Sequence, residues 1–138
     1  MADDRLFTLA EARAMLPQVR ESVERLEEQR LEVHALRSLL QSVQRAATGD
    51  GSSVVTDTAQ LQRRMSELID SIRETVVTIA ELGVQLKDVE RGLVDWQAIH
   101  QERRVLICWQ RGEDAIEWWH DLEAGFSGRQ RIVPEEWD

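Results

Sequence analysis

The sequence has 138 residues, a length that accommodates one domain with a small core. Aspartate and glutamate number 26 against 17 lysines and arginines, and the resulting net charge of -9 disfavours nucleic acid and anionic membranes as partners. The single cysteine excludes an intrachain disulfide, and no run of about 18 apolar residues indicates a membrane span or a secretory signal. We therefore expect a cytoplasmic protein with neither a nucleic-acid nor a membrane partner.

The N-terminal part of the sequence has the pattern of a long amphipathic helix over residues 7–46. Thr8 and Glu11 have the spacing of a capping box. Beyond them, apolar residues recur at alternating spacings of three and four: Leu9, Ala12, Leu16, Val19, Val23 and Leu26. Pro17 interrupts this seam, which predicts either a kink or a short first helix followed by a longer one.

Residues 47–56 are rich in Gly, Ser and Thr, and they predict a flexible connection to a second helix over residues 57–82. Asp57 and Gln60 have the spacing of a second capping box. The apolar positions that follow are Leu61, Met65, Leu68, Ile72, Val76 and Ile79. The two helices should form an antiparallel hairpin. Because two helices alone bury little apolar surface, we expect a homodimer in which the hairpins pack as a bundle.

After residue 83 the apolar period changes from about 3.6 to about 2, which predicts a small antiparallel sheet over residues 84–110. Its strands are expected at 84–89, 93–98 and 105–110. Residues 113–122 have the pattern of a short helix, and the rest of 113–138 has the pattern of an irregular tail. The predicted fold is thus a single mainly α, α+β domain, in which a long helical hairpin precedes a small sheet and a short C-terminal helix.

The most suggestive short motif is the pair Glu117 and His120, separated by two tryptophans. On a helix these positions lie on one face, as in carboxylate-bridged di-metal bundles, and Glu113 extends the stripe by one turn. Carboxylate and imidazole ligands suit iron, manganese or zinc, and Asp95 or a second subunit would complete such a site. The same spacing describes an ordinary solvated face, because di-metal bundles carry two copies of the motif and this sequence has one.

Asp95 and Cys108 lie within apolar strand segments. The carboxylate of Asp95 must be paired, hydrogen-bonded or exposed on the outer face of the sheet. Cys108 is either a small buried hydrophobe or a nucleophile or ligand. Convergence of these two residues with His120 would create a constellation of acid, thiol and imidazole. Arg129, in a turn bounded by glycines, suits a small acidic ligand and equally suits a pair with a neighbouring carboxylate.

A set of short motifs, taken together, resembles one known family. The motifs are Phe7-Thr8-Leu9-x-Glu11-Ala12, Leu16-Pro17, Glu81-Leu82-Gly83, Lys87-Asp88, Gly92-Leu93-Val94-Asp95, Leu106-Ile107-Cys108-Trp109, Gly112-Glu113, Trp119-His120 and Gly125-Phe126. They resemble the uncharacterised prokaryotic domain of unknown function 2203 over nearly the whole chain. Asp95-Trp96-Gln97 stands where that family pattern has Asp-Phe-Pro, so a different strand path is expected there. The resemblance implies no activity, and it implies that a shared site lies among Asp95, Cys108, Glu113, His120 and Arg129.

Three functional hypotheses follow from these residues. The first is a small cytoplasmic protein that binds a divalent metal through Glu113, Glu117, His120 and Asp95. The second is a helical-hairpin module for protein interaction or dimerisation without catalytic activity, whose association would be abolished by charges at Val19, Val23, Leu68 or Ile72. The third is an enzyme that uses Cys108 as a nucleophile, which requires a reactive thiol in the folded protein.

Overall fold

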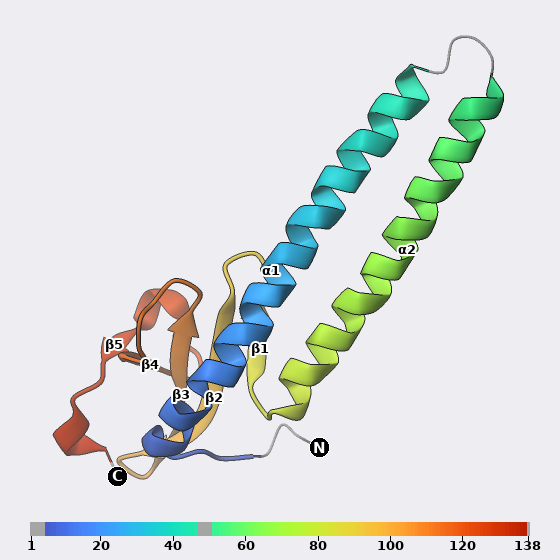
Figure 1. The fold of residues 1–138 in the computed structure, drawn as a ribbon. Helices are drawn as coiled ribbons and strands as arrows, with labels where there is room; N and C mark the ends of the chain where they lie inside the picture. Colours follow the sequence, from blue (N-terminus) through green and yellow to red (C-terminus); the bar gives the residue numbers. More distant parts are fainter. Residues whose placement is uncertain (1–4, 47–50, 138) are drawn as a thin grey trace.

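The computed structural model describes residues 5–46 and 51–137. Within these ranges, two long helices form an antiparallel hairpin that projects from a five-stranded sheet (Figure 1). The helices are α1 (Leu9–Arg45) and α2 (Gly51–Glu81). The strands are β1 (Gln85–Asp88), β2 (Leu93–His100), β3 (Arg103–Gln110), β4 (Trp118–Asp121) and β5 (Gln130–Arg131), and short 3-10 helices follow as η2 (Phe126–Gly128) and η3 (Pro134–Glu136). The mixed α and β class is confirmed.

Helix α1 begins with the capping box that the sequence predicts. The Glu11 amide donates to Thr8 Oγ1 at 3.0 Å, and the Thr8 amide donates to Glu11 Oε1 at 2.8 Å. The helix continues through Pro17, so the alternative of two separate helices is wrong. Proline removes one hydrogen bond of the helix, and the buried residues on either side of it, Leu16 and Val19, hold the segment against the sheet.

Helix α2 begins at Gly51, earlier than the sequence predicts. Asp57 and Gln60 therefore lie inside the helix, and the second capping box is wrong. Residues 47–50 of the predicted connection lie outside the described residues. Glycine and serine cost at most about 1 kcal/mol each in a helix, so they did not prevent the helix from starting before residue 57. The predicted stop at Gly83 is confirmed, since this glycine has a φ of 88°.

The sheet is a meander in which each strand pairs antiparallel with the next one along the chain. The predicted strands within 84–110 are confirmed, and β2 and β3 are joined by a tight turn at Gln101 and Glu102, whose φ angles are 52° and 69°. Such positive φ angles at both central residues suit the twist of a β-hairpin.

The predicted helix over residues 113–122 is wrong. Residues 118–121 form β4, which pairs with β3. The local sequence fits both the helical period of about 3.6 residues and the strand period of 2 residues. Trp118 and Trp119 belong to the apolar pattern of a helix, and as strand neighbours they point to opposite faces of the sheet. The edge of β3 supplies backbone partners to a fourth strand, and this long-range pairing decides the outcome.

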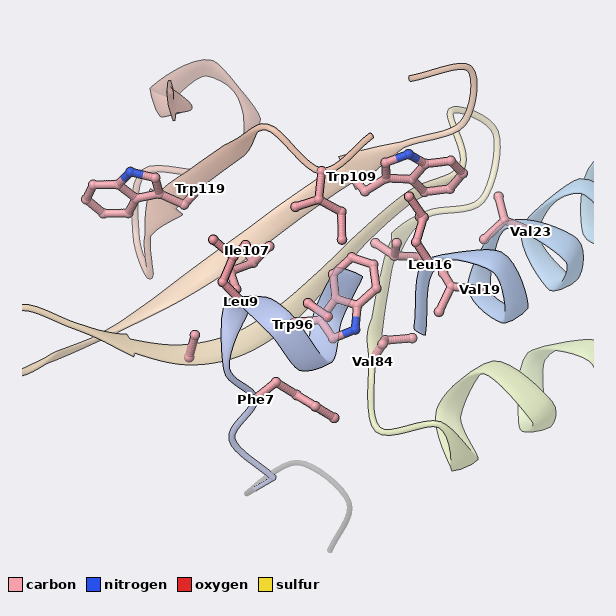
Figure 2. Close-up of a cluster of buried hydrophobic side chains, with 14 of the residues drawn as sticks. Phe7, Leu9, Leu16, Val19, Val23, Val84, Trp96, Ile107, Trp109 and Trp119 are labelled. Carbon is pink, nitrogen blue, oxygen red and sulfur yellow. The ribbon is translucent and has the colours of Figure 1, made fainter. Parts of the chain in front are cut away.

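The core lies between one face of the sheet and the first half of α1 (Figure 2). Trp96, Ile107 and Trp119 occupy neighbouring positions on β2, β3 and β4, and they point towards this core with Trp109. From α1 the core receives Leu9, Ala12, Leu16, Val19, Val23 and Leu26. Among the described residues of α1, none beyond Leu26 is buried, because the outer half of the hairpin extends past the sheet (Figure 1).

Across residues 5–46 and 51–137, neither helix offers an apolar stretch of the length that crossing a bilayer requires.

Candidate metal centre

A buried polar cluster lies on the face of the sheet that points away from the hairpin. Asp95 comes from β2, Cys108 from β3 and His120 from β4, and the three whole residues are 1%, 0% and 3% exposed. Asp95 is the direct cross-strand partner of Cys108, whereas His120 lies two residues beyond the partner of Cys108. Because side chains alternate along a strand, this register directs all three to one face. One ligand atom from each residue lies within 4.8 Å of the other two.

The hydrogen bonds of His120 define which of its nitrogens faces the cluster. Nδ1 lies 2.8 Å from the carbonyl oxygen of Asp121, and Nε2 lies 3.3 Å from Asp95 Oδ2. A carbonyl oxygen only accepts hydrogen bonds, so Nδ1 carries the proton and donates it. In the neutral ring, Nε2 then directs a lone pair at the carboxylate. Two acceptors at this distance repel one another unless a proton or a cation lies between them.

Asp95 is the central acid of the cluster. Burial raises the pKa of Asp95, and the neighbouring His120 is the largest of the influences that lower it. Its Oδ1 is buried and has no hydrogen-bond partner among the described residues. An unsatisfied buried carboxylate oxygen is costly, so the Asp95 carboxylate is suited to a ligand that the polypeptide does not supply.

Cys108 is a protonated thiol in this environment. Burial, followed by the charge of Asp95, raises the pKa of Cys108 from 9.0 to about 12, while the guanidinium of Arg129 acts in the opposite direction. At pH 7 a thiol with this pKa is ionised in only about one molecule in 100,000. Burial and pKa therefore both disfavour the hypothesis of a cysteine nucleophile. A metal ion would stabilise the thiolate directly, because coordination displaces the proton.

Glu113 and Arg129 form a separate ion pair beside the cluster. Arg129 Nη1 donates to Glu113 Oε2 and Nη2 donates to Oε1, both at 2.7 Å. Glu113 Oε1 also accepts from the amide of Gln110 at 2.8 Å. Of the two alternatives that the sequence leaves open for Arg129, the structure has the pair with a neighbouring carboxylate.

Glu117 lies away from the cluster. Its side chain is 49% exposed and approaches Arg131 at 3.6 Å. The predicted helical stripe of Glu113, Glu117 and His120 does not form, because these residues lie on a turn and a strand instead of a helix. The structure brings Asp95 and His120 together with Cys108, and it places neither glutamate in that group. The Asp121 carbonyl that orients His120 could not be predicted from the sequence, since no residue type signals the use of a backbone oxygen.

The chain was compared with known proteins. The model of a family described as an uncharacterised conserved protein, DUF2203, matches residues 5–132. The chain belongs to the DUF2203 family. The match includes every residue of the cluster in this DUF2203 chain, and it confirms the resemblance that the short motifs indicate. Neither the curated proteins nor the solved structures contain a match to the chain.

Proposed function

We propose that this DUF2203 protein binds a divalent transition metal ion through Asp95 Oδ2, Cys108 Sγ and His120 Nε2. The observation that carries the proposal is the buried approach of Nε2 to Oδ2 at 3.3 Å, with Nδ1 committed to the Asp121 carbonyl. A histidine that donates its second nitrogen to a carbonyl oxygen is the usual arrangement of a metal-ligating imidazole.

The spacing of the ligand atoms fits a small cation. Nitrogen and oxygen ligands placed about 2.0 Å from a tetrahedral Zn²⁺ lie about 3.3 Å from one another. The separation of Nε2 and Oδ2 has this value, and Cys108 Sγ lies within 4.8 Å of a ring nitrogen of His120 and of a carboxylate oxygen of Asp95. A small inward movement of the thiol would complete three corners of a tetrahedron. The fourth corner is then left for water or for a substrate, as in catalytic zinc sites.

The ligand set also selects among metals. Of iron, manganese and zinc, manganese prefers oxygen ligands, whereas a thiolate beside an imidazole suits zinc and iron. The proposal is therefore for Zn²⁺ or Fe²⁺, with a site of Asp95, Cys108 and His120 in place of the glutamate stripe that the sequence indicates.

The test is a zinc titration of metal-free protein by calorimetry, together with Co²⁺ spectroscopy. We expect one equivalent of zinc to bind to the parent and to Glu117→Gln, which changes an exposed carboxylate outside the cluster. Cys108→Ser and His120→Ala should bind at least tenfold more weakly, and Cys108→Ser should lose the thiolate-to-cobalt charge-transfer band. Circular dichroism shows whether each metal-free variant is folded. A parent without zinc affinity, or a folded Cys108→Ser that retains the band, would overturn the proposal.

One observation favours a second function, self-association through the outer half of the hairpin. Leu31 and Leu39 are 53% and 49% exposed on α1, where the sheet no longer covers the helix. A second copy of the chain that covers them would give the homodimer that the sequence predicts. A dimer would be compatible with the metal site, because Leu31 and Leu39 lie on α1 whereas the metal cluster lies within the sheet.

Association should be tested at these exposed leucines. Val19, Val23 and Leu68, which the sequence analysis nominates for this purpose, are at most 4% exposed within one chain, so charges there would unfold the protein. Light scattering after size exclusion should give a dimer for the parent and a monomer for Leu31→Asp combined with Leu39→Asp. A parent that is monomeric at high micromolar concentration would contradict this function.

A further inference from the structure

The proposed metal cluster is closed to solvent, so a segment of the chain must move before a metal ion can enter. The Asp95 and His120 side chains are 2% and 4% exposed, and Cys108 is 0% exposed. The hairpin packs on the opposite face of the sheet. On the cluster's own face, Arg129 from the connection between β4 and β5 reaches Cys108. This connection, residues 122–129, is the candidate for the moving segment.

Arg129 closes the connection over the cluster. Its guanidinium interacts with Cys108 and lies 5.3 Å from the ring of Trp118, which is the cross-strand partner of Cys108. It also lies 4.5 Å from the ring of Phe126 in the same connection. The Arg129 side chain is only 10% exposed. Arg129 is therefore a side chain of the connection that lies beside Cys108 and contributes to its burial.

The pair of Arg129 with Glu113 is the strongest contact that holds the connection in place. It is bidentate, with two charge-assisted hydrogen bonds of 2.7 Å, and such pairs are stronger than neutral ones. Glu113 belongs to the turn after β3 and is oriented by the amide of Gln110. The pair thus joins the connection to the turn that follows β3.

Apart from Arg129, the connection is held by local backbone hydrogen bonds and by Arg91 of the turn between β1 and β2, whose guanidinium lies 4.0 Å from the Phe126 ring. These backbone hydrogen bonds are local, since the amides of Ala124, Gly128 and Arg129 donate to the carbonyl oxygens of Asp121, Gly125 and Phe126. Gly125 has a φ of 65° and a ψ of -166°, a combination open essentially to glycine alone, and a side chain added there would contact nothing within 4 Å. Residues 122–125 and Ser127 are exposed and Phe126 is partly buried, so few side chains of the segment are buried against the rest of the protein.

We infer that residues 122–129 form a lid over the Cys108 side of the cluster, and that the Glu113–Arg129 ion pair is the latch that controls access to it. Breaking the latch should speed the opening of the lid without unfolding the sheet. The inference that metal ions enter by this route rests on the proposed metal function. The inference that a thiol reagent reaches Cys108 by this route is independent of that function.

The first arm of the test measures access without any metal. Cys108 is the only cysteine of the chain, so the rate of its modification by N-ethylmaleimide under native conditions reports on lid opening. We expect this rate to rise at least tenfold in Glu113→Gln and in Arg129→Met. The rise in Arg129→Met should occur even though the loss of the guanidinium removes an influence that lowers the pKa of Cys108. Glu27→Gln is the matched control, because it breaks ion pairs with Arg30 and Arg111 elsewhere in the protein.

The control separates lid opening from general destabilisation. Urea denaturation gives the unfolding free energy of each variant. Glu27→Gln should change the rate of Cys108 modification less than twofold, even if it lowers the unfolding free energy as much as Glu113→Gln does. Equal modification rates in the parent and in both latch variants would overturn the inference. Equal acceleration by Glu27→Gln at equal loss of stability would also overturn it.

The second arm measures Zn²⁺ association with metal-free protein by stopped flow. The latch variants should bind zinc at least tenfold faster than the parent and than Glu27→Gln. Faster maleimide reaction in a protein that binds no zinc would support the lid and overturn the metal function. If the parent and both latch variants bind zinc at the same rate and react with maleimide at the same rate, the lid is overturned and the metal function is left intact.

Discussion

Zinc affinity should rise steeply with pH, because Cys108 must lose its proton to become a ligand. Burial, followed by the charge of Asp95, raises the pKa of Cys108 to about 12. At pH 7 the thiol is about five units below this pKa, so its deprotonation opposes binding by about 7 kcal/mol at 1.36 kcal/mol per unit. Each rise of one pH unit lowers this free-energy cost by about 1.36 kcal/mol. The dissociation constant should therefore fall at least tenfold per unit between about pH 6.5 and 8.5.

This dependence can be measured by competition with a chromophoric chelator at several pH values. Calorimetry in buffers of different ionisation enthalpy counts the protons released, and we expect at least one per zinc ion. Cys108→Ser should bind more weakly and show a slope reduced by about one proton, while Glu117→Gln should keep the slope of the parent. A parent whose affinity is independent of pH, or a serine variant with the parent's slope, would refute the assignment of the thiolate as a ligand.

Three further predictions concern the stability of the metal-free protein. Because the folded pKa of Cys108 (about 12) exceeds the ordinary value of 9.0, stability that is present below pH 9 should be lost as pH rises towards 12, by up to about 4 kcal/mol. Denaturant titrations should show this loss in the parent and much less of it in Cys108→Ala. Gly92→Ala should lower the unfolding free energy by about 1–3 kcal/mol, because Gly92 has a φ of 67° and an added Cβ would lie 2.6 Å from Arg111 Cβ and 2.9 Å from Val23 Cγ1. A neutral effect in urea denaturation would contradict that reasoning. Thr8→Ala should cost about 1 kcal/mol by removing the cap of α1, whereas Thr8→Asp, compared in the same assay, should retain most of the stability.

Where short-range patterns govern the structure, the sequence predicted it. The capping box of Thr8 and Glu11 depends on residues three apart, and the stop at Gly83 depends on one backbone conformation. The strands within 84–110 follow from an alternation that is visible in the sequence itself. The start of α2 was predicted too late, because glycine and serine weaken a helix only slightly and the residues after them continue it.

The sequence by itself determined which residues form the buried seam of α1 and where the sheet begins. It placed Asp95, Cys108 and His120 only within a wider set of candidates that included Glu113, Glu117 and Arg129. Tertiary structure alone decided that residues 118–121 are a strand, since their pattern fits two periods and the free edge of β3 selects one. The same pairing decided the candidate site. Register between three strands places Asp95, Cys108 and His120 on one face and separates His120 from Glu113 and Glu117. Register depends on hydrogen bonds between residues far apart in the chain, so no local spacing could reveal it.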